Sequence, residues 1–400
     1  MTMTSENEAD LSNSSKFGSS WNLCDNDSIV LNLSNYTMSE VKWFFYPDID
    51  YILIGHVMPF ILTFGLVGNA LFIYVIMRVK SMRTITNIYL INLAIADSCY
   101  ITFGILDKMA GIRSSPVLLD MHALGVTWCI TVFPFVRMCA FASLFLVTLV
   151  TFDKYYAICK PLQHHLRTSP GRSHTKYVIL LAWFFAFCIA VFTIPNSSRI
   201  VSVCVLYPTQ SQQTYPEVVS YCNPMKKWMP TAVHGVQTLP FFVALFPNIF
   251  MYCQIVRRLH NRKLVGSNIP PLVRNRLKLR NTVAKMLVFN GTIFFLCNMP
   301  FHTTSLIYML SHYFNDASKN AWEIKLQPVQ PIIHLLMYIN SASNPYIYHS
   351  VNRSYRKCLY QAIFCSKPRK SVSMIRSTII PGTLVPNVNL TEAISDDTHL

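Results

Sequence analysis

The sequence is poor in charged residues and in glycine. Only 13% of its 400 residues are charged, whereas a soluble domain usually carries about 25%. Glycine occurs only 12 times, and the sequence has neither a glycine-rich phosphate-binding loop nor a His-Glu-x-x-His zinc motif. These shortages argue against an ordinary soluble domain and against the enzymes that use those motifs. We therefore expect a membrane protein that is not an enzyme.

Long apolar stretches account for most of the chain. Each is close to or above the roughly 20 residues that a helix needs to cross a bilayer, and about twice the length of a barrel strand. The predicted fold class is therefore an all-α membrane protein, a bundle of seven transmembrane helices. The predicted spans are Tyr51–Met77, Thr84–Leu106, Cys129–Phe152, Tyr177–Pro195, Trp228–Val256, Met286–Asn315 and Leu326–Asn352.

The distribution of basic residues predicts the orientation. Most of the 34 Lys and Arg residues follow the first, third and fifth spans or lie in the C-terminal tail. Because such residues favour the cytoplasmic side, we expect an extracellular N-terminus. The net charge of +16 then reflects topology, and no nucleic-acid partner is expected. The predicted divisions are a glycosylated extracellular tail (1–50), a seven-span domain (51–352), an amphipathic membrane-surface helix (353–365) and a disordered cytoplasmic tail (366–400).

Glycosylation motifs gather on the predicted outer side. An Asn-x-Ser/Thr sequence marks an acceptor only where the chain is extracellular. The acceptors expected on this basis are Asn13, Asn26, Asn32, Asn35 and Asn196.

Few of the cysteines lie where oxidation is permitted. Of the 12, only Cys24, Cys129, Cys204 and Cys222 are at or beyond the predicted outer face. A bridge between Cys129 and Cys222 would hold the long loop before the fifth span across the mouth of the bundle. Cys24 and Cys204 either pair with each other or remain free thiols.

The segment "RSYRKCLYQAIFC" after the last span mixes basic and apolar residues, a pattern typical of a short helix on the inner membrane surface. Cys365 at its end, and to a lesser degree Cys358, are candidates for palmitoylation. An unmodified cysteine on an apolar helix face is the alternative.

Polar residues inside the spans form an ordered set. A charge there costs about 2.5–3.5 kcal/mol on insertion scales, so each is a functional candidate. The set comprises "GLVGNALF", "NLAIAD", Asp153-Lys154-Tyr155, Trp183, "FFLCNMPFH" and "NSASNPYIY". Together these resemble the rhodopsin-like (class A) G-protein-coupled receptors over residues 50–365. "DKYYAICKPL", "IPNSSR", "VAKMLVF" and "CNMPFH" resemble the neuromedin U, ghrelin and thyrotropin-releasing-hormone receptors in particular.

The resemblance implies a plasma-membrane receptor for an extracellular ligand, which we expect to be a neuropeptide. Such a receptor activates heterotrimeric G proteins and is a partner of arrestin and of a receptor kinase. The resemblance also implies no cofactor other than a structural sodium ion, held by Asp97, Ser143, Asn340 and Asn344. A plain network of hydrogen bonds between the helices is the alternative for these four residues.

The resemblance also assigns a set of residues to switching and G-protein coupling. In such receptors the acid at Asp153 holds the neighbouring base until the helices part, the two tyrosines meet in the active state, and the prolines kink their helices. The set is Asp153, Lys154, Tyr155, Tyr252, Asn298, Pro300, Asn344, Pro345 and Tyr348.

Three positions depart from the family pattern. Lys154 stands where arginine is usual, and a lysine lacks the planar, bidentate fork of arginine. Asn298 replaces the usual tryptophan, and we expect it to hydrogen-bond towards Asn340. Pro247 lies closer to Tyr252 than the family spacing, so the usual fifth-span kink is not assured, and Tyr252 is either a switch residue or an interfacial tyrosine.

The outer half of the bundle is the expected ligand site. Val136 stands where amine receptors carry an aspartate, and Tyr338 where opsins carry the retinal lysine, so neither ligand is expected. Arg137 either binds a ligand carboxylate or forms a salt bridge with Asp107. His302 either faces the ligand or is a packed core histidine. The candidate ligand-binding residues are Asp107, Val136, Arg137, Phe301, His302, Ser305, His334 and Tyr338.

Three other functions are alternatives to this one. Lys154 and Asn298 motivate a weakly coupling or decoy receptor of the same fold. A lipid or a small acidic ligand is a further alternative. A transporter or channel fits poorly, because the number of spans is odd and Asp97 is the single acid at mid-membrane.

Overall fold

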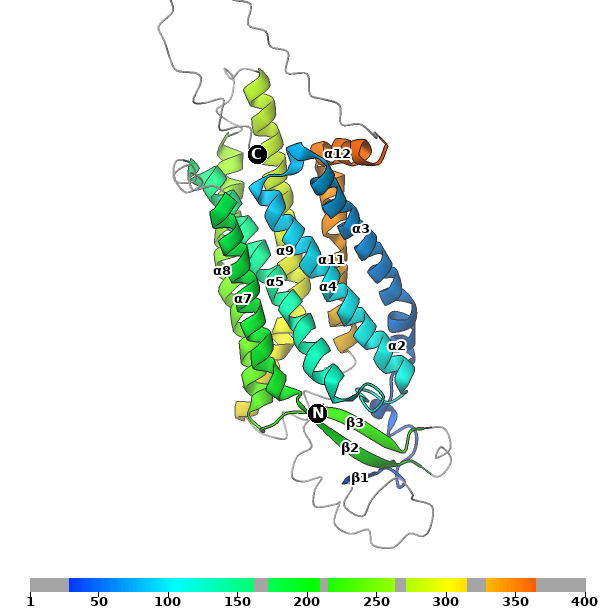
Figure 1. Cartoon of the computed structure of the whole chain (residues 1–400). Helices are drawn as coiled ribbons and strands as arrows, with labels where there is room; N and C mark the ends of the chain where they lie inside the picture. The colour runs from blue at the N-terminus through cyan, green and yellow to red at the C-terminus, as the bar shows by residue number, and fades with distance from the viewer. Residues whose placement is uncertain (1–28, 162–171, 209–214, 263–270, 315–328, 365–400) are drawn as a thin grey trace, which may run out of the picture.

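The computed structural model describes residues 29–161, 172–208, 215–262, 271–314 and 329–364. Within them the chain forms a bundle of long helices with a small sheet at one end (Figure 1). The helices in chain order are α2 (Asp48–Ile52), α3 (Met58–Arg78), α4 (Ile85–Ser114), α5 (Gly125–Cys159), α7 (Arg172–Thr193), α8 (Met229–Arg262), α9 (Pro271–Phe314), α11 (Gln330–Val351) and α12 (Arg353–Phe364).

The predicted seven-helix membrane bundle is confirmed. A π-helical turn at Leu53–Val57 joins α2 to α3, and this unit together with α4, α5, α7, α8 and α9 gives six helices long and apolar enough to cross a membrane. The seventh, α11, has 22 residues, which corresponds to about 33 Å of helix. Its apolar character is diluted by buried polar residues such as Asn340 and Asn344, which face the interior of the bundle.

The outer faces of the helices are apolar and uncovered. Leu180 on α7 is 63% exposed and Val243 on α8 is 70% exposed. In water, such a continuous apolar surface would mark a binding site, but on a membrane-spanning bundle it is the surface that lipid covers.

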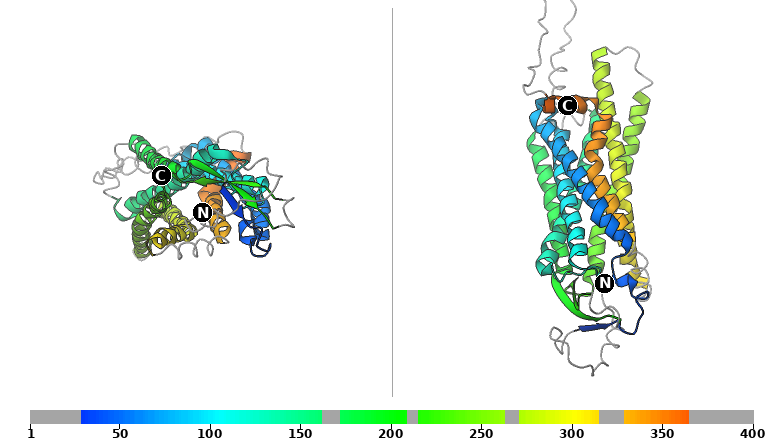
Figure 2. Two further views of the ribbon diagram at one scale, coloured as in Figure 1. Left: turned by 90° about the horizontal axis from the view of Figure 1, so that it is seen from below. Right: turned by 90° about the vertical axis from the view of Figure 1, so that its right-hand side faces the viewer.

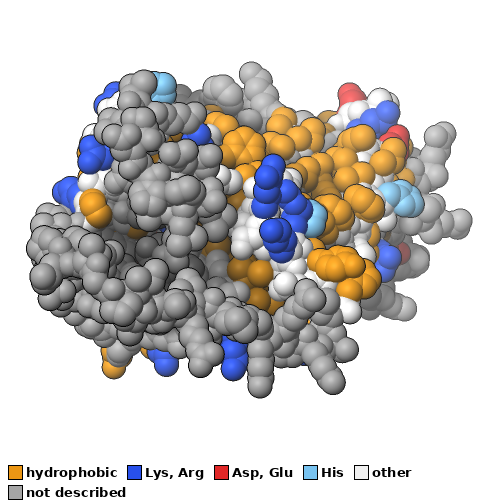
Figure 3. All heavy atoms as spheres, turned by 90° about the horizontal axis from the view of Figure 1, so that it is seen from above, with side chains coloured by type: hydrophobic (Ala, Val, Ile, Leu, Met, Phe, Trp, Pro, Cys, Tyr) orange, Lys and Arg blue, Asp and Glu red, His pale blue; other side chains and the backbone are white. Residues whose placement is uncertain are grey.

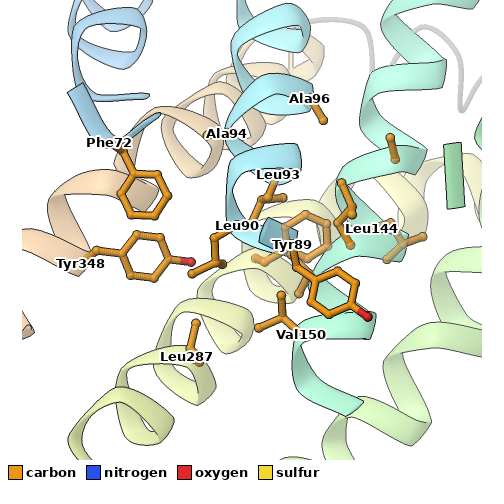
Figure 4. Close-up of a cluster of buried hydrophobic side chains, with 14 of the residues drawn as sticks. Phe72, Tyr89, Leu90, Leu93, Ala94, Ala96, Leu144, Val150, Leu287 and Tyr348 are labelled. Carbon is orange, nitrogen blue, oxygen red and sulfur yellow. The ribbon is translucent and has the colours of Figure 1, made fainter. Parts of the chain in front are cut away.

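The interior on the α12 side is filled by side chains from eight helices, namely α3, α4, α5, α7, α8, α9, α11 and α12, and Figure 4 shows part of this cluster. Phe72 of α3 stacks on Tyr348 of α11 with ring centroids 5.1 Å apart. Leu90 of α4, Val150 of α5 and Leu287 of α9 belong to the same buried cluster. Because van der Waals contacts, rather than hydrophobic transfer, hold helices together in lipid, this close packing fixes their positions.

Gly65 allows three helices to approach closely. A Cβ atom at this position would lie 2.6 Å from Ile101 Cδ1 of α4 and 2.9 Å from Ala342 Cβ of α11. A small residue here therefore lets α3 sit against both neighbours.

The sheet lies across the end of the bundle opposite to α12 (Figure 2). The strand β2 (Arg199–Leu206) pairs antiparallel with β3 (Val218–Asn223) and parallel with β1 (Ile29–Asn32). Leu33, Phe44 and Val117 join Val205 and Tyr207 in a small buried cluster beneath it. Residues 29–47, predicted only as part of the tail 1–50, thus fold onto the loop between α7 and α8. The alternating β-branched residues in "RIVSVCVL" were the available signal for β2.

The opposite end carries α12 and many bases. The Tyr74 hydroxyl of α3 donates to the Ala362 carbonyl at 3.3 Å, and Tyr355 and Cys358 are buried, so α12 packs against the bundle by one face. Seen from this end, Lys and Arg side chains gather on the described surface (Figure 3). The exposed bases include Arg78, Lys80, Arg83, Arg353 and Lys357.

Candidate functional site

A buried carboxylate joins three helices at the centre of the bundle. Asp97 of α4 is fully buried. Its Oδ1 accepts a hydrogen bond from Ser143 Oγ of α5 at 2.9 Å, and its Oδ2 accepts one from Asn344 Nδ2 of α11 at 2.6 Å. Neither of the two salt bridges among the described residues involves it. A carboxylate removed from water without a cation is costly, so the cluster is arranged around an acid that lacks a positive partner.

Other oxygens near this network are also incompletely bonded. The side-chain Oδ1 atoms of Asn69, Asn340 and Asn344 are buried and have no hydrogen-bond partner among the described residues. Asn69 Nδ2 meanwhile donates to the Ser341 carbonyl at 3.3 Å, which ties α3 to α11. The interhelical network given as the alternative is therefore present. The remaining oxygens, with the Asp97 charge, are also the donor set that suits a hard cation such as sodium.

Asp153 and Lys154 form a closed latch where α5 approaches the α12 end. Lys154 Nζ lies 3.2 Å from Asp153 Oδ2 and donates to Thr86 Oγ1 of α4 at 2.5 Å. The Thr86 hydroxyl in turn donates to Asp153 Oδ2 at 2.9 Å. Lys154 is only 7% exposed, so its charge is withdrawn from the surface. Sequence reasoning missed Thr86, because one sequence does not say which turn of α4 faces the end of α5.

Tyr252 lies inside the bundle and not in an interfacial belt. Its hydroxyl accepts a hydrogen bond from Thr151 Oγ1 of α5 at 3.2 Å. It also lies against Gly291 of α9, where a Cβ would come within 1.8 Å of the hydroxyl oxygen. Tyr348 is buried nearby in the same cluster, and its hydroxyl has no hydrogen-bond partner among the described residues. Tyr155 packs elsewhere, against the cluster of Ile158, Ile255, Leu259 and Ala284.

Asn298 does not make the bond that the sequence suggested. Its Nδ2 donates to the Phe294 carbonyl one turn earlier in α9, at 2.7 Å. The expected hydrogen bond towards Asn340 is therefore wrong, because the amide is satisfied within its own helix. Pro300 and Pro345 lie inside α9 and α11, where each removes one backbone donor.

In the outer half, Asp107 has partners other than Arg137. Its Oδ1 accepts from Trp128 Nε1 of α5 at 2.8 Å, and its Oδ2 lies 3.5 Å from Lys108 Nζ. The predicted alternative of an Arg137–Asp107 salt bridge is therefore wrong. Sequence reasoning missed Trp128, although a tryptophan at the outer end of a span is a common hydrogen-bond donor. Arg137 makes no hydrogen bond or salt bridge with any described residue, and its Nη1 is buried.

Aromatic and imidazole rings line the outer halves of α9 and α11. The Phe301 ring lies 5.9 Å from His334, and His334 lies 6.4 Å from Tyr338. Val136 and Phe301 are only partly buried against the cluster that contains Tyr338. His334 is also only partly buried. The structure thus brings together predicted residues from α5, α9 and α11 in one partly buried cluster.

His302 and Ser305 are buried on the α8 side of this region. The His302 ring stacks on Phe241 of α8, with centroids 4.0 Å apart and planes inclined by 14°. Ser305 Oγ lies 2.9 Å from His234 Nδ1, also on α8. One face of the His302 ring thus packs against α8, whereas its Nδ1 has no hydrogen-bond partner among the described residues. His234 is a partner of Ser305 that sequence reasoning missed.

A disulfide fastens the sheet over this end of the bundle. Cys129 of α5 is bonded to Cys222 of β3, as predicted. Cys204 of β2 is also disulfide-bonded, and Cys24 lies outside the described residues. Ser220 N–H of β3 donates to Asp120 Oδ1 at 3.0 Å, which ties the loop between α4 and α5 to the sheet. Burial beneath the sheet raises the pKa of Tyr207, whose hydroxyl donates to the Pro216 carbonyl.

The predicted modification sites differ in accessibility. Asn32 and Asn35 are exposed at the sheet end, whereas Asn196 is only partly exposed and its amide oxygen is buried. Asn13, Asn26 and Cys365 lie outside the described residues. Cys358 is 8% exposed, which leaves its thiol covered by the packing of α12.

The fold, the central network and the end latch together define a helix-bundle membrane receptor. The family model of the seven-transmembrane receptors (rhodopsin family) matches residues 68–348. The chain therefore belongs to this family, and it is a multi-pass plasma-membrane receptor and not an enzyme.

Within this family, the chain is similar to receptors for peptides. The chain is 28% identical over 305 residues to growth hormone secretagogue receptor type 1 of Oryctolagus cuniculus, covering 75% of this chain and 77% of that protein. It is 24% identical to galanin receptor 2a of Danio rerio, covering 87% of each chain. It is 26% identical to the substance-P receptor of Mus musculus, covering 85% of this chain and 77% of that one. The resemblance to class A peptide receptors is thus confirmed.

Proposed function

We propose that this chain binds an extracellular peptide and responds by activating heterotrimeric G proteins. The relatives are receptors for neuropeptides, and the family is one of membrane receptors. The observation that carries the proposal is the hydrogen-bond network of Asp97, which links α4, α5 and α11. This network lies between the rings of Phe301 and His334 in the outer half and the Asp153–Lys154 latch at the other end.

The two ends of the bundle have the chemistry that the two partners require. At the sheet end, half-buried rings of Phe301 and His334 leave apolar surface that a peptide side chain can cover. At the other end, Lys154 is held by Asp153 and Thr86 and becomes available only if α4 and α5 separate. The proline-interrupted helices α9 and α11 can adopt a second packing, and a ligand that binds this packing more tightly shifts the population towards it.

A sodium ion would stabilise the resting arrangement. Asp97 and Ser143, with the orphaned amide oxygens of Asn340 and Asn344, are the residues that would hold it. When bound, the ion supplies the positive charge that the Asp97 carboxylate lacks.

The remaining assignments depend on which end of the bundle is extracellular. The sheet end carries exposed Asn32 and Asn35, and the opposite end carries the exposed bases around α12, which supports an extracellular N-terminus. We propose that Asn32 and Asn35 are glycosylated, with Asn13, Asn26 and Asn196 as further acceptors. Cys365 is proposed to be palmitoylated, and arrestin and a receptor kinase are proposed to act on the 366–400 tail.

A peptide-library screen tests this function. The full chain is expressed in cultured cells, and calcium and cyclic-AMP responses are recorded for synthetic peptides. The expected result is a peptide that elicits a response only in expressing cells, with half-maximal effect in the nanomolar to micromolar range. If no library peptide responds, although the receptor reaches the surface and lipid or small-acid libraries do respond, the peptide assignment is wrong.

A weakly coupling receptor is the second candidate, and one observation favours it. Lys154 replaces the arginine of the family pattern and is buried in the latch. When the helices part, it would offer the G protein a compact ammonium group and not a planar guanidinium. Such a receptor would bind peptides in the same screen but give little nucleotide exchange.

A further inference from the structure

Several buried polar atoms in the outer half of the bundle lack hydrogen-bond partners among the described residues, and three of them lie on the neighbouring helices α5, α8 and α9. They are Arg137 Nη1 of α5, Thr238 Oγ1 of α8 and His302 Nδ1 of α9. Thr238 is 1% exposed and His302 is 7% exposed. Buried polar groups are nearly always hydrogen-bonded in folded proteins, so three such atoms in one part of the molecule require an explanation.

The alignment of α5 with α8 places Arg137 and Thr238 at the same height along the bundle axis. Asn248 Nδ2 donates to Thr148 Oγ1 at 3.0 Å, and Thr151 Oγ1 donates to the Tyr252 hydroxyl at 3.2 Å. These pairs are separated by 100 and 101 residues, so the two helices run side by side in the same direction with a nearly constant offset. The same offset aligns Arg137 with Gln237 and Thr238.

The helical repeat places Arg137 and Gln237 on the facing sides of α5 and α8. Positions separated by 4 and by 11 residues lie on one face of a helix, and Arg137 has this spacing to Phe141 and to Thr148, which bonds to α8. On α8, Gln237 has the same two spacings, to Phe241 and to Asn248, and Thr238 is the next residue. Phe141 and Phe241 belong to one buried cluster.

His302 completes the group from α9. Its ring stacks on Phe241 at 4.0 Å and lies beside the backbone of Gln237. We place the proton of the neutral ring on Nε2, because Nδ1 is the nitrogen without a partner. In the neutral ring Nδ1 is then an acceptor, open to an N–H donor.

No acid neutralises Arg137 in the described part of the chain. The two salt bridges there use Asp107 with Lys108 and Asp153 with Lys154. The other oxygen of Asp107 is taken by Trp128. The Arg137 side chain is half-buried and its Nη1 is fully covered. A guanidinium removed from water without a counter-ion is destabilising, so a ligand carboxylate would supply what the described residues do not.

We propose that Arg137, Thr238 and His302 form a subsite for a carboxylate of the ligand that has an N–H close beside it. Arg137 grips both carboxylate oxygens in a bidentate pair, Thr238 donates its hydroxyl, and His302 Nδ1 accepts the adjacent N–H. A peptide offers this grouping at a free C-terminal residue or at an Asp or Glu side chain beside the backbone. The inference rests on the proposed function and adds the class of ligand.

A test without ligand uses the stability of the purified receptor. Arg137→Met keeps much of the side-chain length and removes the unpaired charge, so the thermal midpoint of the ligand-free receptor should rise by about 2–4 °C. Arg113, which is exposed on α4, provides the matched control Arg113→Met, with no change expected. A midpoint lowered by Arg137→Met would show that the guanidinium has a structural partner, and would overturn the proposal.

A test with ligand uses paired peptide libraries on the full-length receptor. Random octapeptides are made with a free or an amidated C-terminus, and with Asp and Glu either included or replaced by Asn and Gln. Potent hits should come only from libraries that contain a carboxylate, and the arm that supplies them identifies its source. Converting that carboxylate of a hit to its amide should weaken half-maximal activation about 10–100-fold, the range for a charge-assisted hydrogen bond.

The variants then separate the subsite from general damage. On Arg137→Gln the acid and amide forms of the hit should become equally potent, whereas Arg113→Gln should preserve the wild-type difference. Thr238→Val should reduce the difference only in part. Potent hits from the library without any carboxylate, or equal losses of both forms on Arg137→Gln, contradict the subsite. If no arm activates the receptor, the peptide function fails, while the thermal midpoint still decides whether Arg137 is an unpaired charge.

Discussion

The Thr86 hydroxyl of α4 accepts a hydrogen bond from Lys154 of α5 at 2.5 Å and passes its own to Asp153 at 2.9 Å. The base of the family's coupling motif is thus held by two helices and not only by its neighbouring acid. Since both bonds involve a charged group, each contributes about 1.5–3 kcal/mol when it is made in a buried setting. Opening this end of the bundle requires that both bonds be broken.

Replacing Lys154 by arginine should strengthen coupling. The guanidinium can donate to Asp153 and Thr86 in the resting state, and on opening it offers a planar, stacking surface to the G protein. We expect Lys154→Arg to raise agonist-driven nucleotide exchange roughly 3–10-fold, measured by GTPγS binding in membranes. Lys176→Arg, at an exposed position of α7, is the control. A wild-type receptor that already couples at full strength and gains nothing would contradict the weak-coupling interpretation.

Removing the hydroxyl that bridges the latch should raise basal activity. Thr86→Val preserves the shape of the side chain but removes the acceptor for Lys154 and the donor to Asp153. A loss of about 1.5 kcal/mol from the resting state corresponds to roughly tenfold more of the open form without agonist. Thr292→Val, whose hydroxyl bonds only to its own helix, controls for the substitution itself. Unchanged or lower basal exchange in Thr86→Val would show that the bridge does not hold the resting state.

Sodium should stabilise the receptor through Asp97. If the ion binds the folded receptor, the stability gained is RT ln(1 + [Na⁺]/Kd), about 1.4 kcal/mol at ten times Kd. We expect a thermal midpoint a few degrees higher in sodium chloride than in choline chloride for the wild type and for Asp48→Asn, an exposed control. Asp97→Asn should abolish the difference. Equal midpoints in both salts for the wild type would leave the cluster as a hydrogen-bond network without an ion.

A methyl group at position 65 should disturb the packing of α3. Its carbon would lie 2.6 Å from Ile101 Cδ1 and 2.9 Å from Ala342 Cβ, so the helices must separate. Overpacking of this kind costs about 1–3 kcal/mol, and the thermal midpoint and surface expression of Gly65→Ala should fall. Gly55→Ala provides the comparison, because no atom lies within 4 Å of a Cβ at that position. Equal behaviour of the two variants would argue against close helix contact at Gly65.

The sequence was sufficient for the membrane-spanning architecture, because apolar length is imposed by the bilayer and is visible without partners. Span ends were less well predicted: α4 continues to Ser114 and α5 to Cys159, where polar residues can extend a helix beyond the lipid. The strands were not found, since Ile29–Asn32 gains its hydrogen bonds only by pairing with a distant segment.

The sequence predicted which helix each candidate residue lies on better than it predicted which side chain that residue contacts, and the reason is geometric. The rotation of each helix about its axis decides which side chains meet, and one sequence does not reveal it. Asp107 therefore turned out to bond with Trp128 and not with Arg137, and Asn298 with its own helix and not with Asn340. The Asp97 cluster was predicted only because the family resemblance indicated which residues of the different helices face one another.

Guanine-nucleotide exchange with purified components tests the central claim most directly. The detergent-solubilised receptor is mixed with purified heterotrimeric G proteins of the main classes and with the most potent peptide from the library screen. The account predicts that the peptide accelerates GTPγS uptake by at least one class, and more strongly with Lys154→Arg. If the wild-type receptor and Lys154→Arg both bind the peptide saturably but leave GTPγS uptake at the rate measured without receptor, this receptor does not activate G proteins.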